Sequence, residues 1–474
     1  MSESRALGRV LESVASVHDA GIRYFNGHQR PGEPPLVRGS LPFLGNAVSF
    51  GRNMLAFLRR CRREHGDVFT IFVAGRRMTF VCDPHSYLAV IRSNALQFEP
   101  FTAQVMERAF DFPRMHEEVD MEGVNALARR RLKGEELRAL SEGMCAQVCR
   151  LLDGDVRLSG STGEFGLYRL IWDTVFAAGT RVIFGEDLLE RDSSRAFEDL
   201  ERNFGLLVAG LPKVVTRKGR FALRSLAATF SDIGIEPSEW MRDQHQLVAS
   251  LPPSKRGRTM VAALWALHAN TIPSTFWTLA HLLSNEAAMS AVLGELEHVL
   301  GGSALTSLSI DQLNRLRLVD SVSREALRLS SGTLIARKAV EAVRLETDTG
   351  SWSIREGDEV FLAPQLIHHD PEFFERPDDF VFDRFVEGDA SCPRSELGGK
   401  PTTAFAFTPF GVGRHTCPGR FFAVNEIKIM VVSLLTRLSF RPVSAPLPGF
   451  QRNRAGLGVL PPDRDIVVRW SRRS

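Results

Sequence analysis

The chain has 474 residues, of which 44% are hydrophobic and 24% charged. This composition is typical of a globular protein with a substantial core, and it excludes a disordered or fibrous chain. The 59 basic and 56 acidic side chains leave a net charge of +3, which excludes a strong overall field for nucleic acid or an anionic membrane. Six cysteines without a C-x-x-C pair are too few for a disulfide scaffold and favour a reducing, cytoplasmic setting.

The N-terminal part predicts a lead-in followed by a small sheet. Residues 6–19 have the pattern of a short amphipathic helix, and the Pro- and Gly-rich stretch after it is expected to be irregular. We therefore divide the chain into a lead-in at residues 1–40 and one domain at residues 41–474. Apolar residues on both sides of Ala74-Gly75-Arg76-Arg77 predict a β-hairpin over residues 67–83. With no signal-peptide pattern and no run of about 18 to 20 apolar residues, the sequence predicts a soluble protein.

The middle of the chain predicts a helical body. From about residue 100 to residue 330 there is almost no strand pattern, and apolar residues recur at helical spacing. The predicted helical segments are 136–152, 163–184, 194–209, 256–283, 285–300 and 311–329. Strands are predicted at Ala339–Leu345 and Ser351–Ala363, joined at Asp348-Thr349-Gly350, before a loop-rich segment at 371–410 and a last long helix after Pro418. The predicted fold class is mainly α (α+β), a single domain with a large helical body and a minor β-sheet region.

The most specific pattern is the run from Phe410 to Gly419, Phe-Gly-Val-Gly-Arg-His-Thr-Cys-Pro-Gly, which places Cys417 after a glycine-rich turn and before a helix. Glycines let a backbone pass close to a flat cofactor, and the N-terminal end of a helix favours an ionised sulfur. The pattern indicates a thiolate ligand. The alternatives are a buried structural cysteine and a zinc site that also uses His415, although no other Cys or His pair lies nearby at ligand spacing.

Two other segments supply a charged cluster. Glu325 and Arg328 are three residues apart, on one face of a predicted helix, and Arg384 lies in the loop-rich segment. The ordinary interpretation of such a pair is a solvated surface salt bridge. A buried cluster of all three residues would instead lock the loop that carries Cys417.

With these elements in this order, the sequence resembles the cytochrome P-450 family of haem-thiolate enzymes. The F-x-x-G-x-R-x-C-x-G pattern is met in the run that ends at Gly419, the E-x-x-R motif is met at Glu325 and Arg328, and Arg384 matches the arginine of that cluster. The resemblance extends over essentially the whole chain. It is strongest to the branch that contains cholesterol 7-alpha-hydroxylase, sterol 12-alpha-hydroxylase and prostacyclin synthase, at Pro84–Tyr87, Gly210–Pro212, Pro364–Leu366 and Arg454–Pro462.

The resemblance implies one haem b (iron protoporphyrin IX), with Cys417 as the axial ligand of the iron and two arginines at the haem propionates. The residues that it implies for cofactor binding are Cys417, Arg414, Arg337, Phe410, Gly411 and Gly419. The W-x-x-x-R haem contact of the family is missing around residues 124–140. Any of Arg130, Arg131 and Lys133 could replace this haem contact, and the alternative for each is a position on a solvated helix face.

The predicted long helix departs from the family pattern at Asn270-Thr271-Ile272-Pro273, where most members carry an acid before the threonine. A carboxylate there helps to relay protons, whereas the Asn270 amide cannot titrate. Thr271 remains, and Pro273 frees a backbone carbonyl that can hold a water molecule. We predict that Asn270 and Thr271 are catalytic residues that position a water chain. The alternative is that Asn270 only fills a helical kink.

The resemblance also suggests an apolar pocket and therefore a hydrophobic substrate. The suggested lining residues are Phe98, Phe101, Phe110, Phe204, Leu207, Trp265, Ala269, Leu334 and Leu457–Val459. Each of them is equally typical of an ordinary core position.

Together these features predict a monooxygenase that hydroxylates a steroid- or lipid-like molecule with O₂ and two electrons. Because no G-x-G-x-x-G unit is present, the electrons are expected from a separate ferredoxin or flavoprotein reductase. Its docking surface is predicted at Arg129, Arg130, Arg131 and Lys133. No nucleic-acid partner and no transmembrane anchor are expected. The alternatives are a haem-thiolate isomerase or dehydratase that acts on a peroxide without O₂ or reductant, and a haem-binding sensor without enzyme activity.

Overall fold

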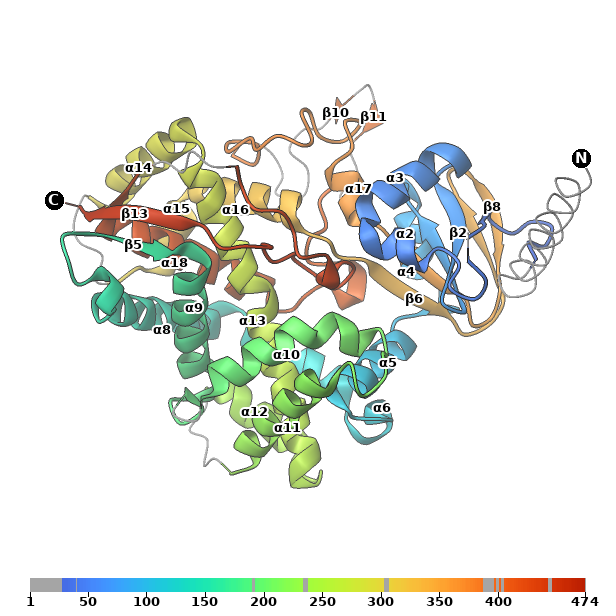
Figure 1. Cartoon of the computed structure of the whole chain (residues 1–474), viewed down its shortest axis with the longest axis horizontal. Coiled ribbons are helices and arrows are strands. Elements are labelled where there is room, and N and C mark those ends of the chain that lie inside the picture. Colours follow the sequence, from blue (N-terminus) through green and yellow to red (C-terminus); the bar gives the residue numbers. More distant parts are fainter. Residues whose placement is uncertain are drawn as a thin grey trace, which may run out of the picture.

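The structure is a computed structural model that describes residues 28–39, 41–189, 192–232, 238–301, 307–386, 396–397, 400–401, 405–441 and 446–473. The predicted helix at residues 6–19 lies outside this part of the chain. Helices make up most of the molecule, and the largest sheet lies on one side of it (Figure 1). The predicted fold class, mainly α with a minor β region, is confirmed.

The largest sheet has the strand order β1-β2-β3-β9-β6-β4. Its strands β2 (Val68–Val73) and β3 (Arg76–Val81) form the predicted hairpin. Both turn residues, Ala74 and Gly75, have positive φ angles, of 46° and 83°. A two-residue hairpin turn needs such angles for its twist to match the right-handed twist of the two strands. Strand β1 (Leu36–Val37) pairs in parallel with β2, so the end of the predicted lead-in is part of this sheet.

The two strands predicted after residue 330 are each divided between two sheets. Strands β6 (Ile335–Ala339) and β9 (Glu359–Leu362) belong to the large sheet, next to β4 (Leu96–Gln97). Strands β7 (Val343–Thr347) and β8 (Gly350–Ile354) form a separate hairpin that closes at the predicted joint. The chain passes from β8 to β9 through Gly357, whose φ of 85° favours glycine and allows the change of sheet.

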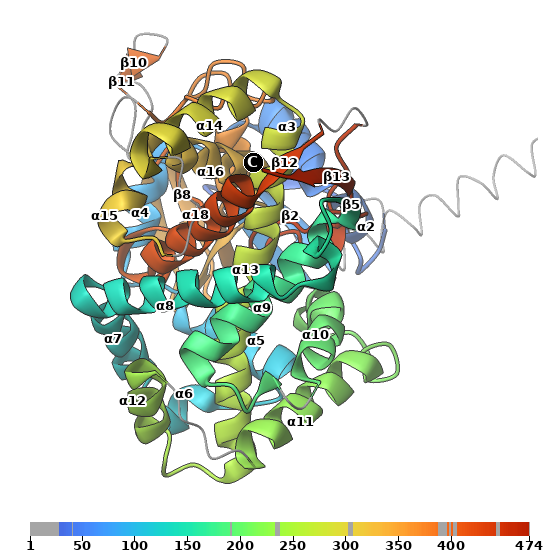
Figure 2. The same ribbon diagram turned by 90° about the vertical axis from the view of Figure 1, so that its left-hand side faces the viewer.

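The helical body surrounds the long helix α13, which packs against α9, α11, α16 and α18 and runs through the middle of the molecule in Figure 2. The helices that build this body are α5 (Glu99–Phe110), α6 (Met115–Glu118), α7 (Met121–Arg131), α8 (Gly134–Asp153), α9 (Leu167–Phe184), α10 (Ser193–Val208), α11 (Arg217–Asp232), α12 (Glu239–Leu247), α13 (Pro253–Leu283), α14 (Glu286–Leu300), α15 (Ile310–Arg315), α16 (Arg317–Ser330) and α18 (Arg420–Arg437). Shorter helices next to the sheet are α2 (Ala47–Arg52), α3 (Met54–His65), α4 (Tyr87–Arg92) and α17 (Pro364–His368).

Two helix predictions were wrong in part. The segment predicted as a helix at 163–184 begins with strand β5 (Thr162–Gly166), which pairs with β13 (Val467–Arg472). Strand β13 also pairs with β12 (Leu438–Phe440). Because the partner of β5 lies about 300 residues away in the chain, its strand conformation depends on a contact that local periodicity does not contain.

The helix predicted at 311–329 is two helices, α15 and α16. They are separated by Leu316, whose φ of −80° and ψ of 78° are not helical. Leu316 is fully buried, so the apolar pattern continues through the break and hides it. The short two-stranded pair β10 (Glu396–Leu397) and β11 (Lys400–Pro401) lies in the segment predicted as mostly loop. No helix in the described part of the chain is long and apolar enough to cross a membrane.

Candidate functional site

Cys417 lies on the wall of a cavity of about 470 Å³ and is accessible in this structure. The loop closes through a hydrogen bond of 2.9 Å from the Cys417 N–H to the Phe410 carbonyl. Burial raises the pKa of the Cys417 thiol, while the backbone N–H groups of Gly419 and Arg420, at the start of α18, act in the opposite direction. The helix start therefore faces the sulfur as predicted, but burial outweighs its effect.

The predicted loop residues Phe410, Gly411 and Gly419 also line the cavity. Gly411 has a φ of 76°, and Gly413 has a φ of 67° with its Cα so close to Ile91 that an added Cβ would lie 2.7 Å from the isoleucine Cγ2. Two left-handed glycines, separated by the extended Val412, turn the backbone before Cys417. The loop conformation therefore depends on these glycines.

Arg337, in β6, is 3% exposed and lines the same cavity. Its guanidinium carbon lies 5.5 Å from the centre of the Phe98 ring, and its Nη1 donates to the carbonyl of Ala336 at 2.8 Å. Burial lowers the pKa of Arg337, and no carboxylate in the described part of the chain forms an ion pair with it. Because a buried charge without a counter-ion is costly, this guanidinium fits an anionic group of a ligand in the cavity.

Arg414 does not line the cavity. Its side chain is 72% exposed, its Nη2 lies 3.2 Å from a Glu99 carboxylate oxygen, and its Nε donates to His415 Nε2 at 2.9 Å. His415 lines the cavity in its place. Arg414 is nevertheless close enough to Arg337 for its charge to lower the pKa of Arg337, so the two arginines lie near each other although only Arg337 lines the cavity.

None of the three basic residues considered for a third haem contact lines the cavity. The side chain of Arg130 is 70% exposed, and Lys133 is exposed as well. Arg131 forms ion pairs with carboxylates of Glu136, Glu239 and Asp243. Arg129, predicted only as part of a docking surface, donates to the Arg414 carbonyl at 3.3 Å.

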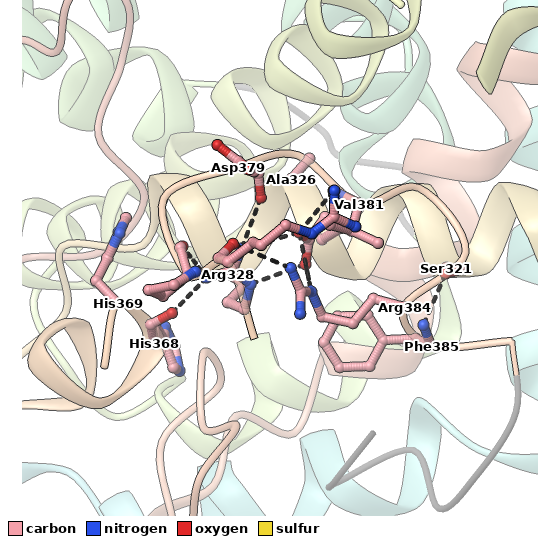
Figure 3. Close-up of polar contacts among 12 residues, drawn as sticks. Ser321, Ala326, Arg328, His368, His369, Asp379, Val381, Arg384 and Phe385 are labelled. Carbon is pink, nitrogen blue, oxygen red and sulfur yellow. Dashed lines mark hydrogen bonds and ion pairs between the residues drawn. The ribbon is translucent and has the colours of Figure 1, made fainter. Parts of the chain in front are cut away.

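The predicted charged cluster is buried (Figure 3). Arg328 Nε and Arg384 Nε donate to Glu325 Oε2 at 2.8 and 3.0 Å. The side chains of Glu325 and Arg328 are 0% exposed, and that of Arg384 is 8% exposed. Arg328 also donates to the carbonyls of His368, Pro377 and Asp379. The His368 ring in turn accepts the N–H of Thr408, at the start of the cysteine loop. The cluster is thus connected to the segment that holds Cys417.

Asn270 and Thr271 both line the cavity, on α13. The Asn270 side-chain oxygen accepts the N–H of Val459 at 3.0 Å and lies 3.4 Å from Arg454 Nη2. The carbonyl of Ala269, whose helical partner would be the N–H that Pro273 lacks, accepts from the same Arg454 nitrogen at 3.4 Å. Asn270 therefore connects α13 to the C-terminal segment, and its NH₂ is the part available to the cavity.

Thr271 contacts an acid that the sequence reasoning missed. Its Oγ1 donates to the Leu267 carbonyl at 3.0 Å and lies 3.4 Å from Oε2 of Glu426. Glu426, on α18, is 1% exposed and lines the cavity, and burial raises its pKa well above the usual value. The sequence does contain a signal for Glu426, because it is the one acid among the mostly apolar residues of the predicted last helix.

The cavity wall contains only part of the predicted apolar set. Phe98, Leu334 and Leu457–Val459 line it. Phe110, Phe204 and Trp265 lie outside this wall and pack on one another, with the Phe204 and Trp265 rings stacked at 4.0 Å. Phe101, Leu207 and Ala269 also lie outside it. Other apolar lining residues are Met106, Met115, Met121, Ala262, Ala263 and Ala266.

A mainly helical domain with a cysteine sulfur on the wall of a largely apolar internal cavity, at the start of a helix, has the architecture of a haem-thiolate enzyme. The residues fit that group, because Cys417 offers a sulfur ligand for iron and Arg337 a buried cation for a propionate. The family model for cytochrome P-450 matches residues 34–218 and 254–468. The chain therefore belongs to the cytochrome P-450 family, which binds haem b through a cysteine thiolate, and it is an enzyme of that family.

Curated relatives match over nearly the whole chain. Cytochrome P-450 7A1 of Rattus norvegicus is 32% identical over 97% of each protein. Cytochrome P-450 7B1 of Mus musculus is 30% identical, over 94% of this chain and 92% of the relative. Prostacyclin synthase of Homo sapiens is 32% identical, over 93% and 94%. These similarities confirm the resemblance to this branch of the family.

Proposed function

We propose that this protein is a monooxygenase that hydroxylates a hydrophobic, steroid- or lipid-like molecule with O₂ and two electrons from a separate donor. The observation that carries the proposal is the cavity, which has Cys417 on one wall and Thr271 on another, with largely apolar side chains around them. A relative of Cricetulus griseus that is 32% identical is named cholesterol 7-alpha-monooxygenase. That name supports the proposed substrate class.

Haem b, bound through Cys417, supplies oxygen activation in this proposal. The residues of the chain bind and orient the substrate. Ala262, Ala263 and Ala266 present small side chains from α13, which leave room for a flat molecule. Apolar surfaces exclude water, and the methionines of the lining adapt their shape to the substrate. The Thr271 hydroxyl holds a proton beside the cavity, and the Asn270 NH₂ donates a hydrogen bond into it.

We further propose that the electron donor, of the ferredoxin or flavoprotein reductase type, docks at the exposed basic residues of α7 and the turn after it. Arg129 contacts the backbone of the cysteine loop, and Arg130 and Lys133 are exposed nearby. Arg131 is a weaker candidate because three carboxylates already pair with it. A cytoplasmic location stays part of this proposal, on the sequence argument alone.

A second candidate is a haem-thiolate isomerase or dehydratase that acts on a peroxide. The similarity to prostacyclin synthase and the absence of an acid beside Thr271 on α13 favour it. The two candidates differ in their need for electrons. An isomerase consumes neither O₂ nor reductant, whereas a monooxygenase consumes both.

The experiment adds sterols and fatty acids, one at a time, to the haem-loaded protein and records the spin-state change in the absorption spectrum. For each binder, product formed per reductant consumed is then measured with an electron donor. We expect a binder that is hydroxylated only with reductant and O₂, and we expect Cys417→Ala but not Cys61→Ala to abolish the thiolate signature of the ferrous carbon monoxide spectrum. Turnover of a peroxide without reductant would contradict the monooxygenase proposal.

A further inference from the structure

The cavity continues along α13 well beyond Thr271. Its wall follows one face of this helix, at spacings of three and four residues, from Ser274 back to Thr259. At 1.5 Å per residue, Thr259 and Thr271 are about 18 Å apart along the helix. Because α13 begins at Pro253, Thr259 lies near its N-terminal end. The cavity therefore has a reacting end near Thr271 and a second end near Thr259, which we call the remote end.

Helices α7 and α12 bound the remote end. Helix α12 ends at Leu247, shortly before α13 begins at Pro253, so the chain itself keeps α12 near the start of α13. Arg131 of α7 joins the two shorter helices through ion pairs with Glu239 and Asp243 of α12. Figure 2 shows α7 and α12 next to each other, to one side of the lower half of α13. Small side chains keep the space between these helices open, namely Ala128 of α7 and Ala262 and Ala263 of α13.

Unpaired polar groups of α12 lie in the wall of the remote end. Gln244 is 4% exposed and lines the cavity, and its amide forms no hydrogen bond within the described part of the chain. One turn earlier, Trp240 also lines the cavity, and its Nε1 is buried without a hydrogen-bond partner among the described residues. Residues four apart on a helix are neighbours on one face, so the amide and the indole lie side by side. Buried polar groups without partners are costly, and a ligand group that pairs with them removes this cost.

The remote end is polar but carries no charge. Among the described residues, the ionisable side chains that line the cavity are Arg337, His415, Cys417 and Glu426, and none of them belongs to α7 or α12. Arg131, which lies between these two helices, does not line the cavity and is already paired with three carboxylates. A buried carboxylate or ammonium group needs a counter-ion, which the remote end does not offer. It therefore fits an uncharged group of a ligand.

The donors and acceptors of α12 select a hydroxyl group. The Gln244 amide both donates and accepts hydrogen bonds, and the Trp240 N–H donates. A hydroxyl group also does both, whereas a ketone, an ether or an ester only accepts. At the reacting end, Asn270 offers its NH₂ alone, because its oxygen already accepts from Val459, so a hydroxyl group there would find a donor without an acceptor.

We propose that Gln244, together with the Trp240 N–H, binds a free hydroxyl group of the substrate, at the end of the molecule away from the oxidised carbon. The hydroxyl oxygen accepts from the indole or the amide NH₂, and its proton is donated to Gln244 Oε1. This inference rests on the proposed function and narrows its substrate class to hydrophobic alcohols. Carboxylic acids of similar shape bind less well, because no cation of α7 or α12 faces the cavity.

The test measures binding to the haem-loaded protein without turnover, from the change in the haem absorption spectrum. The probes are a sterol with one free hydroxyl group, its methyl ether and the analogue without that oxygen, and a long-chain fatty alcohol with the fatty acid of equal length. In the wild type we expect the methyl ether and the deoxy analogue to bind about 10- to 100-fold more weakly than the sterol. The fatty alcohol should bind more tightly than the fatty acid.

Variants then assign the preference to α12. Gln244→Leu should raise the Kd of the sterol about 10-fold and leave that of the deoxy analogue unchanged, because only the sterol loses a hydrogen bond. Trp240→Phe should act in the same direction. Its matched control is Trp352→Phe, which removes an indole N–H that donates to Thr347 at 3.2 Å in the separate β7–β8 hairpin. This control should leave every Kd unchanged.

Equal affinities of the sterol and its methyl ether in the wild type, or an unchanged preference in Gln244→Leu, would overturn the inference. So would the absence of binding by both alcohols. Easier loss of haem from Gln244→Leu and Trp240→Phe with the alcohol preference intact would also overturn it, since the two residues would then contact the cofactor. Turnover of a bound alcohol without reductant would overturn only the proposed monooxygenase function, because the affinities are measured without turnover.

Discussion

Replacing Glu325 by glutamine tests whether the buried charged cluster stabilises the fold. Both carboxylate oxygens of Glu325 accept hydrogen bonds only: Oε1 accepts from the Val381 N–H at 3.0 Å and from Arg328 Nη2 at 2.8 Å, and Oε2 accepts from Nε of Arg328 and Arg384. A glutamine has one oxygen and one NH₂ group. Whichever way its amide is turned, an NH₂ group faces N–H donors, and two buried guanidinium groups lose their counter-ion.

Breaking a buried ion pair from one side costs about 3–5 kcal/mol. With an m value near 3 kcal/mol/M, the urea midpoint of the haem-loaded protein should fall by about 1 M. The matched control is Glu346→Gln, because Glu346 pairs with Arg344 at 3.3 Å with both side chains about 70% exposed. Exposed pairs contribute about 0–1 kcal/mol, so its midpoint should move by no more than about 0.3 M.

The measurement is urea unfolding followed by far-ultraviolet circular dichroism and by haem absorbance. Ser321→Ala is a milder variant of the same region, since the Ser321 hydroxyl accepts the Phe385 N–H at 2.9 Å (Figure 3). It should cost about 1–3 kcal/mol, for one buried donor left without its acceptor. Equal midpoints for Glu325→Gln and Glu346→Gln would refute the reasoning, because burial would then not decide the effect of losing the charge.

Two other predictions concern α13. In Gly458→Ala the new Cβ would lie 2.1 Å from Asn270 Oδ1, so we expect the free energy of unfolding in urea to fall by about 2–5 kcal/mol. The control Gly456→Ala shares the positive φ, but its Cβ meets nothing closer than 3.5 Å, so it should lose about 1–2 kcal/mol. Equal losses in the two variants would contradict the proposed contact. Burial lowers the pKa of His268 from 6.5 to about 3, so the free energy of unfolding of the wild type should fall by about 1.4 kcal/mol per pH unit as the pH falls below 6.5. His268→Gln should reduce this slope, whereas His116→Gln, at an exposed histidine, should not. An unchanged slope in His268→Gln would contradict the assignment of the pH dependence to His268.

Local sequence patterns were sufficient for the cysteine loop and the hairpin. At the loop, glycine at 411 and 413 and the helix start after Pro418 are properties of neighbouring residues, and the structure contains both left-handed glycines there. At the hairpin, Ala74 and Gly75 stand between two apolar runs, and they take the left-handed turn conformation that joins the two strands. The cysteine loop also identified the family, because its pattern is long and specific.

Contacts between distant segments could not be predicted in this way. Strand β5 forms because β13 lies beside it, and Arg414 pairs at the surface with Glu99, which is 315 residues away. Helix periodicity predicts only that Glu426 lies on the last long helix. Its contact with Thr271 forms where α18 packs against α13, and it joins residues 155 positions apart, which a local pattern does not contain.

The position of Glu426 on α18 has a consequence for how the site is held. The helix begins at Arg420, three residues after Cys417, so a short turn joins the cysteine to the element that carries the carboxyl group. From Arg420 to Glu426 the helix rises by about 9 Å. An acid on α13 would instead move with the helix that forms the wall beside the substrate. On α13, position 270 carries an amide that ties this helix to Val459, and the hydroxyl of Thr271 contacts Glu426 of α18 beside the cavity.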